Sequence, residues 1–443
     1  MDIDVPPAPD ATETSLSSSE PIDLVGAPFA VIESDPHVFT SLARTLGIRN
    51  VEFAELYDVE SYAVDHLNPK GLVFCFLWRK DELVPANFAD PVAERVWFAN
   101  QLSHDACASQ ALLNIVLNCP DIDIGERLAE FKRETEEMSP VMKGLAISSS
   151  PFIRTAHRSF SRPCDLRGAL HSAATTTLDA AKAKPKSKPA NKRAATKKPK
   201  KEAEGDNEDE EAYHFIAYVP AQGKVWELDG LKSGPLEVGE LADEDEGKTW
   251  MDVVRPALRM KMAKYGGGGD GTNIRFCLLA LTEGQYEKQS DRFESLKRER
   301  VALERRMPAG WEAQVKPDVL EESKYAFISP TSDPSAFGPT FAPDFSSMRM
   351  SRDVAILQLP GAQLIPTWER CVRDAVQAKV LLEDEIKRGK NAHTEHIRRT
   401  HDYEPFITEF IGALHKEGLL DALLSVNDPK SNGASNNKKR KKD

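Results

Sequence analysis

The sequence predicts an α/β protein in which helices flank a sheet of antiparallel strands, with a helical extension toward the C-terminal end. A continuous apolar run at residues 71–78, bounded by turn residues, is typical of a buried strand. A longer apolar run at residues 106–119 contains neither Gly nor Pro and predicts a buried helix. From residue 283 onward the chain is highly charged and carries apolar residues at helical spacing, which predicts the extension.

Three further segments predict strands of the sheet. Residues 213–218 and 224–228 are rich in aromatic and aliphatic side chains, and the turn at 220–223 between them makes an antiparallel pair. Residues 273–280 form a last apolar run of strand length. The sheet is therefore expected to combine segments from both halves of the chain.

Shifts in composition divide the chain into five segments. Between residues 161 and 212 a basic cluster is followed by an acidic run, and neither can build a core, so this part is predicted to be a disordered insertion. The predicted segments are a disordered lead at 1–27, a folded domain at 28–282 that contains this insertion, a charged helical arm at 283–390 with a loop insertion at 308–366, a short helical unit at 391–426 and a basic disordered tail at 427–443.

Bulk properties exclude several classes of protein. The net charge is −12, which argues against direct nucleic-acid binding. No apolar run has the length of a membrane span, and the first residues lack the features of a secretory signal, so we expect an intracellular protein without membrane partners. The six cysteines are scattered without a CxxC pair, and we expect neither disulfides nor a zinc site.

One cysteine stands where nucleophilic chemistry needs it. Cys107 opens the predicted helix, and the free N–H groups of a helix N-terminus favour a thiolate and lower the pKa of a thiol. Asp105, two residues earlier, is positioned to cap that helix. Cys107 is therefore the candidate nucleophile.

Three other residues complete the pattern of a thiol hydrolase. His214 begins one strand of the predicted pair and is the candidate base, and Asp229 ends the other strand at the same edge, where it would orient His214. Gln101, six residues before Cys107, would donate its amide N–H to an oxyanion. The residues alone leave another interpretation open, in which Cys107 is a buried helix cysteine and His214 a structural histidine.

The spacing of these residues resembles the ubiquitin carboxyl-terminal hydrolase family of papain-like cysteine peptidases. The resemblance includes Gln101, Cys107, His214 and the motif 227–230. It extends over Asn118 and over residues 32–36, 97–101, 142–146, 215–220, 231–235 and 254–256. Residues 397–407 resemble the C-terminal extension of the proteasome-associated subgroup, the isozyme L5 type.

The resemblance implies a papain-like fold and a deubiquitinase that needs no cofactor or metal. Cys107 would attack the carbonyl after the terminal glycine of ubiquitin and form a thioester, with His214 as base and then acid. Asp229 would orient His214, and Gln101 with the Cys107 N–H would stabilise the oxyanion. We expect acidic groups to contact the basic C-terminal tail of ubiquitin, with Glu33 and Asp35 as the candidates.

Two features depart from the family pattern. Asp105 stands where the family usually has Asn, and its charge would raise the thiol pKa. The segment 161–212 corresponds to the active-site crossover loop and is unusually long, which predicts tolerance of bulky leaving groups.

The resemblance also implies partners. The C-terminal extension would bind the adaptor domain of a proteasomal ubiquitin receptor, and it would also allow entry into a chromatin-remodelling complex. Two basic clusters, at 192–201 and 438–442, resemble nuclear localisation signals, so cytoplasm and nucleus are both expected. Two alternatives remain: a catalytically weak ubiquitin-binding scaffold that acts through its extension, or a hydrolase of a ubiquitin-like modifier.

Overall fold

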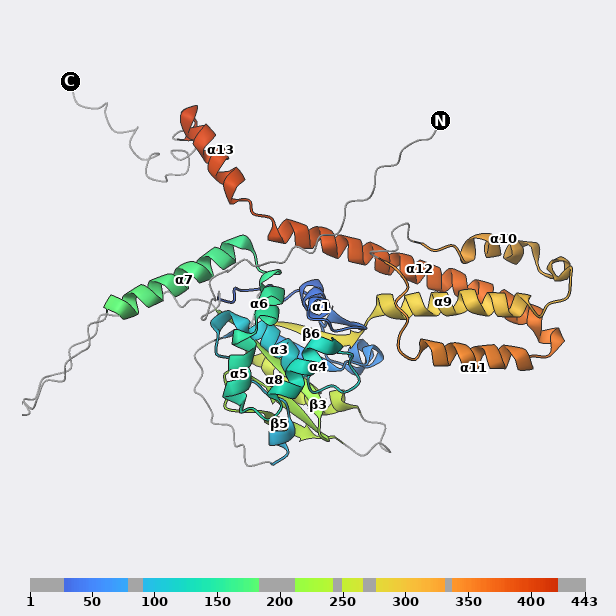
Figure 1. Cartoon of the computed structure of the whole chain (residues 1–443), viewed down its shortest axis with the longest axis horizontal. Helices are drawn as coiled ribbons and strands as arrows, with labels where there is room; N and C mark the ends of the chain where they lie inside the picture. The colour runs from blue at the N-terminus through green and yellow to red at the C-terminus, as the bar shows by residue number, and fades with distance from the viewer. Residues whose placement is uncertain are drawn as a thin grey trace, which may run out of the picture.

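The computed structural model has two parts, an α/β lobe and an elongated helical arm (Figure 1). It describes residues 28–78, 91–182, 212–241, 249–265, 276–330 and 337–420. The predicted lead at 1–27 and tail at 427–443 lie outside these residues.

Helices and strands of the lobe follow the predicted order. Its strands are β1 (Val51–Glu55), β2 (Gly71–Trp78), β3 (Ala212–Ala221), β4 (Lys224–Leu228), β5 (Leu236–Glu240) and β6 (Phe276–Glu283). Its helices are α1 (Pro36–Thr45), α2 (Ser61–Val64), α3 (Cys107–Val116), α4 (Gly125–Thr135), α5 (Pro140–Ser149), α6 (Pro151–Arg158), α7 (Pro163–Lys182) and α8 (Trp250–Tyr265). The arm and the C-terminal end contain α9 (Gln285–Glu304), α10 (Pro317–Ala326), α11 (Phe345–Gln358), α12 (Gly361–Thr400) and α13 (Glu404–Lys416).

The described strands form one antiparallel sheet in the order β1-β6-β2-β3-β4-β5. Successive side chains of a strand face opposite sides, so the sheet has two different cores. Phe215 and Ala217 of β3 pack in the core that includes α1, α3 and α6, whereas Ile216 and Tyr218 pack in the core under α8. The predicted α/β class, with an antiparallel sheet flanked by helices, is confirmed.

The arm has a core of its own, built from α9, α10, α11 and α12. Trp368 of α12 is 1% exposed, packs against Trp311 at 4.8 Å between ring centroids and donates to a carboxylate oxygen of Glu304 at 3.1 Å. The prediction that 308–366 is a loop insertion is wrong, because α10 and α11 lie within it. The high Pro and Ser content of this segment predicts a loop, but a few of its apolar residues are buried in the core of the arm. These residues pack α10 and α11 against α9 and α12.

Two other predicted boundaries differ from the structure. The segment 161–212, expected to be disordered, begins with the 20-residue helix α7, and its residues 183–211 lie outside the described part. A break between the arm and the C-terminal unit was expected at 391, but α12 continues through it to Thr400. Nothing interrupts the helix there, since 383–400 contains no Pro and a single Gly389.

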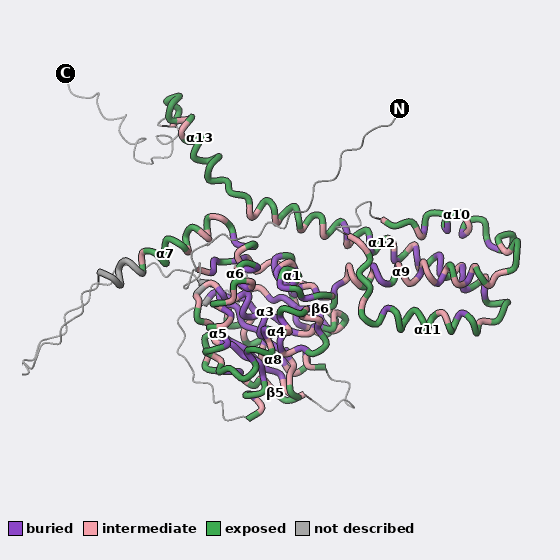
Figure 2. The backbone as a smooth tube through the Cα atoms, in the orientation of Figure 1, coloured by how far each residue is buried: buried purple, intermediate pink, exposed green. Residues whose placement is uncertain are grey.

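The helix α13 is exposed along its length, and so are most residues of α7 between 163 and 176 (Figure 2). None of the residues of α13 is buried in this chain. Within the described ranges, no helix combines the length and the apolarity needed to cross a membrane.

Candidate active site

Cys107 is the first residue of α3, as the sequence predicts. A 3-10 turn, His104–Ala106, precedes the helix, and the N-cap residue is Ala106, without a side-chain cap. The expectation that Asp105 caps α3 is therefore wrong, because the extra turn places Asp105 one residue too early for the N-cap position.

The thiol lies in an environment that keeps it protonated. Burial, with the negative charge of Asp105 second, raises the pKa of Cys107 to about 12. The backbone N–H groups of Ala108, Cys107 and Phe215 act in the opposite direction. The expected lowering of the thiol pKa at the helix N-terminus is thus reversed, because desolvation outweighs the helix dipole. The contact with the Phe215 N–H places the sulfur against β3, at the residue that follows His214 in the chain.

His214 and Asp229 meet across the β3–β4 pair. The Nε2 of His214 lies 2.8 Å from a carboxylate oxygen of Asp229, which also accepts from the Leu231 N–H at 3.0 Å. Burial alone would raise the pKa of Asp229, but the hydrogen bond and charge of His214 and the Leu231 N–H hold it below its usual value. The bond at Nε2 leaves the Nδ1 of His214 as the nitrogen for a thiol.

Gln101 is held against the turn that carries Asp229. Its backbone N–H donates to the Gly230 carbonyl at 2.8 Å. A Cβ at position 230 would stand 2.9 Å from both the Gln101 Cβ and the Gln110 Nε2, so this close approach requires glycine. All four predicted site residues therefore lie on two elements that touch: the start of α3 with its entry segment, and the β3–β4 pair.

Comparison with known proteins shows the family to which the chain belongs. A family model described as "Ubiquitin carboxyl-terminal hydrolase, family 1" matches residues 29–263, more than half of the chain. The chain belongs to the ubiquitin carboxyl-terminal hydrolase family. It is a cysteine-type deubiquitinase, as the sequence resemblance predicted. A second model, "Ubiquitin carboxyl-terminal hydrolases", matches residues 375–420, which span the end of α12 and all of α13.

Relatives of this hydrolase cover most of its length. Ubiquitin carboxyl-terminal hydrolase isozyme L5 of Dictyostelium discoideum is 30% identical over 397 residues, which cover 89% of this chain and 94% of that protein. The ubh-4 hydrolase of Caenorhabditis elegans is 31% identical and covers 60% of this chain and 71% of its own. Among solved structures, the Trichinella spiralis UCH37 catalytic domain bound to ubiquitin vinyl methyl ester is 28% identical, with a TM-score of 0.44, covering 59% of this chain and 98% of that one.

A row of amide side chains on α3 and just beyond its C-terminal end, which the sequence reasoning missed, holds the entry segment of the hydrolase. Gln110 donates to the Ala99 carbonyl, and Asn114 accepts from the Ala99 N–H at 3.1 Å. Asn118 accepts from the Trp97 N–H at 2.8 Å and donates to the Trp97 carbonyl at 2.8 Å. The three amides fix the segment that ends at Gln101.

The signal for this row is present in the sequence. Gln110, Asn114 and Asn118 recur at a spacing of four in an otherwise apolar run, which places them on one face of the helix. A polar stripe on a buried helix predicts an extended segment bound along it, because buried amides need partners.

The predicted ubiquitin contacts, Glu33 and Asp35, are engaged within the chain. The Nε of Arg399, near the end of α12, lies 2.8 Å from a carboxylate oxygen of Glu33, and a guanidinium nitrogen lies 3.9 Å from Asp35. Asp35 also caps α1 by accepting from the N–H groups of His37 and Val38 at 2.8 and 3.1 Å. Both carboxylates therefore contribute to the structure.

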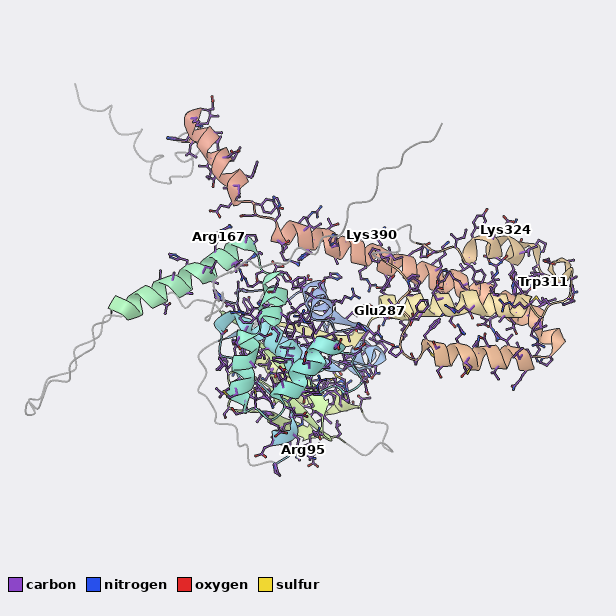
Figure 3. All side chains as sticks on the ribbon, viewed as in Figure 1. Arg95, Arg167, Glu287, Trp311, Lys324 and Lys390 are labelled. Atoms are coloured by element: carbon purple, nitrogen blue, oxygen red, sulfur yellow. The ribbon has the colours of Figure 1, made fainter. Side chains whose placement is uncertain are left out.

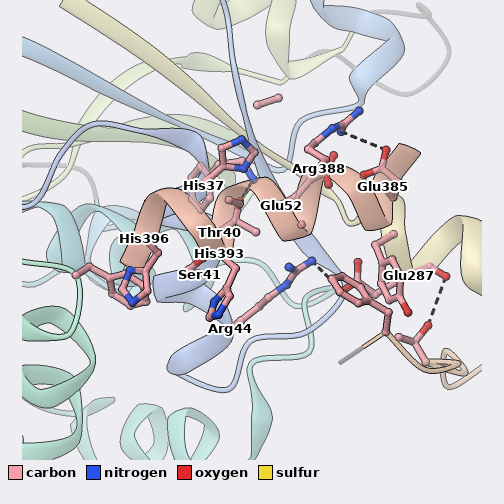
Figure 4. A pocket seen from close by; sticks show the side chains of 18 of the residues that line it. His37, Thr40, Ser41, Arg44, Glu52, Glu287, Glu385, Arg388, His393 and His396 are labelled. Atoms are coloured by element: carbon pink, nitrogen blue, oxygen red, sulfur yellow. Dashed lines mark hydrogen bonds and ion pairs between the residues drawn. The ribbon is translucent and has the colours of Figure 1, made fainter. Parts of the chain in front are cut away.

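A cavity of about 790 Å³ lies where the arm of the hydrolase meets the lobe (Figure 4). It is lined by His37 and Arg44 of α1, Glu287 of α9, and His393 and His396 of α12, among others. None of the four predicted site residues lines it, so this cavity is separate from the reaction site. In the described part of the chain, no cluster of His, Cys, Asp and Glu is suited to holding a metal ion.

Proposed function

We propose that Cys107 is the nucleophile with which this deubiquitinase cleaves the bond after the C-terminal glycine of ubiquitin. The observation that carries the proposal is the 2.8 Å bond between His214 and Asp229, one residue along β3 from the Phe215 N–H that contacts the Cys107 thiol. Since burial keeps the thiol protonated, a base must remove its proton during the attack.

The reaction follows in two halves. The Nδ1 of His214 takes the thiol proton while the sulfur attacks the carbonyl carbon. The oxyanion that forms accepts hydrogen bonds from the N–H groups of the Gln101 side chain and the Cys107 backbone. His214 then gives its proton to the leaving group, and a thioester remains. Water attacks the thioester, His214 accepts a proton from it, and the thiol is restored with free ubiquitin. Asp229 stabilises the imidazolium in both halves.

The experiment is turnover of ubiquitin that carries a small fluorogenic C-terminal leaving group. We expect the full chain to be active, Cys107→Ala to be inactive and Cys164→Ala, which changes an exposed cysteine, to match the wild type. Activity that survives Cys107→Ala would refute the assignment. Binding of ubiquitin without turnover would favour the scaffold alternative, and turnover of only a ubiquitin-like modifier in a matched panel would favour a hydrolase of that modifier.

The extension supports a second proposal, that α13 binds the adaptor domain of a proteasomal ubiquitin receptor. Tyr403, Phe406 and Phe410 are each at least half exposed, and α13 buries none of its residues, so an apolar face needs a partner. A chromatin-remodelling complex is a further candidate for the same surface.

The affinity of the purified adaptor domain for variants of this chain tests the proposed role of α13. Phe406→Asp with Phe410→Asp should weaken binding at least tenfold, because each buries a charge. The control is Leu357→Asp on α11, which is 69% exposed and lies outside α13. If the Phe406→Asp, Phe410→Asp double variant and Leu357→Asp bind the adaptor domain with equal affinity, the binding surface does not include Phe406 and Phe410.

Localisation follows as a proposal from the sequence. The basic clusters at 192–201 and 438–442, outside the described residues, would direct part of the protein to the nucleus and leave the remainder in the cytoplasm. Replacing the basic residues of each cluster by Ser in a fluorescent fusion, singly and together, would show which cluster acts. An unchanged nuclear fraction in the double replacement would exclude both.

A further inference from the structure

A buried charge network lies on the face of the sheet opposite α3. Glu227 of β4 is 4% exposed, and one of its carboxylate oxygens accepts from the Nζ atoms of Lys232 and Lys261, both at 2.9 Å. The other oxygen accepts from the Tyr218 hydroxyl at 3.0 Å. Burying a carboxylate is costly unless it is paired, so three donors on one carboxylate mark a built network.

The network supports the turn that carries Asp229. Residues two apart on a strand share a face, so Glu227 and Asp229 lie on the same side of β4 and its extension. The Lys232 backbone N–H donates to the Asp229 carbonyl at 2.9 Å, and the Lys232 carbonyl accepts from the Asn100 side chain at 2.5 Å. Lys232 thus connects Glu227 to both the Asp229 turn and the segment that leads to Gln101.

The network also approaches the imidazole of His214 through Lys261 and the Phe76 ring. The Phe76 ring packs edge-on to His214, with 5.7 Å between ring centroids. The Nζ of Lys261, on α8, lies 5.9 Å from the centroid of the same Phe76 ring. One aromatic ring therefore separates an ammonium group from the proposed base.

The charges of the network do not cancel among themselves. Two ammonium groups share one carboxylate, which leaves one positive charge to balance Asp229, and both Lys232 and Lys261 act electrostatically on Asp229. Burial alone would raise the pKa of Glu227, but the two ammonium groups, Lys261 foremost, hold it below its usual value. Burial lowers the pKa of Lys261, and the negative charges of Glu227 and Asp229 oppose that lowering.

We propose that Glu227 is a positioning residue for the reaction, and that the two lysines bound to it set the charge beside the catalytic pair. The positive excess helps to keep Asp229 ionised, and it contributes to the electrostatic potential in which the catalytic pair gains or loses a proton. This inference rests on the roles proposed above for His214 and Asp229. The titratable groups near that pair are Tyr218 of β3, Glu227 of β4, Lys232 of the turn, Lys261 and Tyr265 of α8, and Cys107 with Asp105 at the start of α3.

Two variants of opposite charge test the proposal through the pH profile of kcat/KM on the fluorogenic ubiquitin substrate. Glu227→Gln leaves two ammonium groups beside a neutral amide, so we expect the acid limb to move to lower pH by on the order of half a unit. Lys261→Met removes one positive charge, so we expect the acid limb to move to higher pH by a similar amount. Loss of positioning should also lower the plateau of Glu227→Gln by about tenfold.

Control variants and a measurement of Tm distinguish an electrostatic role of the network from a purely structural one. Lys261→Arg retains the charge and should restore the wild-type profile, and Lys288→Met, which removes an exposed lysine paired with Glu283, should leave it unchanged. If the two test variants shift the limb in the same direction, or lower Tm without any shift, the network only holds the fold and the inference is wrong. An inactive wild-type chain would instead refute the proposed function itself. Should Glu227→Gln fail to fold, Lys232→Met serves as the second variant and should shift the limb in the direction of Lys261→Met.

Discussion

At the scale of single residues, the charge of Asp105 makes the Cys107 thiol less reactive, because it opposes the stabilisation of a thiolate by the helix N-terminus. This charge is the second cause, after burial, of the raised pKa of Cys107. In Asp105→Asn this charge is lost, so the pKa falls and the thiolate fraction at pH 7 grows, about threefold for each half unit. We expect iodoacetamide to alkylate Cys107 correspondingly faster.

The alkylation rate is measured by mass spectrometry on the peptide that contains Cys107, across pH 6 to 9. Glu130→Gln, a matched loss of an exposed carboxylate on α4, is the control and should react like the wild type. Equal rates for Asp105→Asn and the wild type would mean that burial alone suppresses the thiolate.

His157 gives the stability of the hydrolase a pH dependence of known sign. It is fully buried, its Nε2 donates to the Ala30 carbonyl at 2.8 Å, and its Nδ1 accepts from the Ser109 hydroxyl at 2.7 Å. Burial lowers the pKa of His157 to about 4 from 6.5. As pH falls below about 6.5 the unfolded chain binds a proton that the folded chain refuses, so stability is lost on acidification, by about 2 kcal/mol at pH 5.

His157→Gln removes this titration while an amide can still serve both partners. We therefore expect the free energy of unfolding, measured by urea denaturation, to fall less between pH 7 and pH 5 in the variant than in the wild type. The exposed His37→Gln should follow the wild type. A variant that keeps the full pH dependence would assign it to other groups.

At the scale of elements, the site depends on how closely the Asp229 turn approaches the segment before α3. Gly230→Ala would place a Cβ 2.9 Å from the Gln101 Cβ and the Gln110 Nε2, so one of the two segments must shift. We expect kcat to fall at least tenfold with little change in KM, because Gln101, the proposed oxyanion donor, would move while the surface that binds ubiquitin would not.

Gly168→Ala is the matched control for this substitution. Gly168 lies in α7, and a Cβ added there would meet nothing within 4 Å, so the same chemical change is accommodated. Steady-state kinetics on the fluorogenic substrate compare the two. A Gly230→Ala enzyme with wild-type kcat would show that Gln101 does not depend on this contact.

The sequence predicted those elements whose signal is local. The run at β2 is buried on both faces and therefore uniformly apolar, and the spacing of His214 and Asp229 across a short hairpin implied their meeting. The helices α10 and α11 were missed because their few buried residues matter only once α9 and α12 supply the other half of a core. The raising effect of Asp105 on the Cys107 pKa was predicted, but the larger effect of burial was missed for a similar reason, since burial is a property of the tertiary structure.

At the scale of the whole molecule, ion pairs join the C-terminal end of the chain to the lobe. Arg167 is at the end of α7 nearer to α12 (Figure 3). Its guanidinium nitrogens lie 3.0 Å from a carboxylate oxygen of Asp402 and 2.6 Å from one of Glu404. Arg399 lies 2.8 Å from Glu33. These pairs are exposed or partly exposed, so each contributes little to stability and is weakened by salt. The ion pairs between the extension and the lobe are therefore easily broken.

The pair at Glu33 places the extension in competition with the substrate. The sequence predicts that Glu33 contacts the basic tail of ubiquitin, yet in the free chain Arg399 pairs with one oxygen of that carboxylate, and Arg162 lies 3.8 Å from the other. Arg399→Ala should therefore lower KM for the ubiquitin substrate by up to about fivefold, the equivalent of 1 kcal/mol, with little change in kcat. The difference from the wild type should shrink as ionic strength rises, because salt screens the competing pair.

Steady-state kinetics at two salt concentrations measure this, with Arg398→Ala as the control. Arg398 pairs with Glu395 on its own helix at 2.6 Å, so its loss removes the same charge without freeing Glu33. If both variants lower KM equally, the effect is one of net charge, and Glu33 is not the shared site. If Arg399→Ala raises KM instead, Arg399 itself contacts ubiquitin, and the end of α12 belongs to the substrate-binding surface.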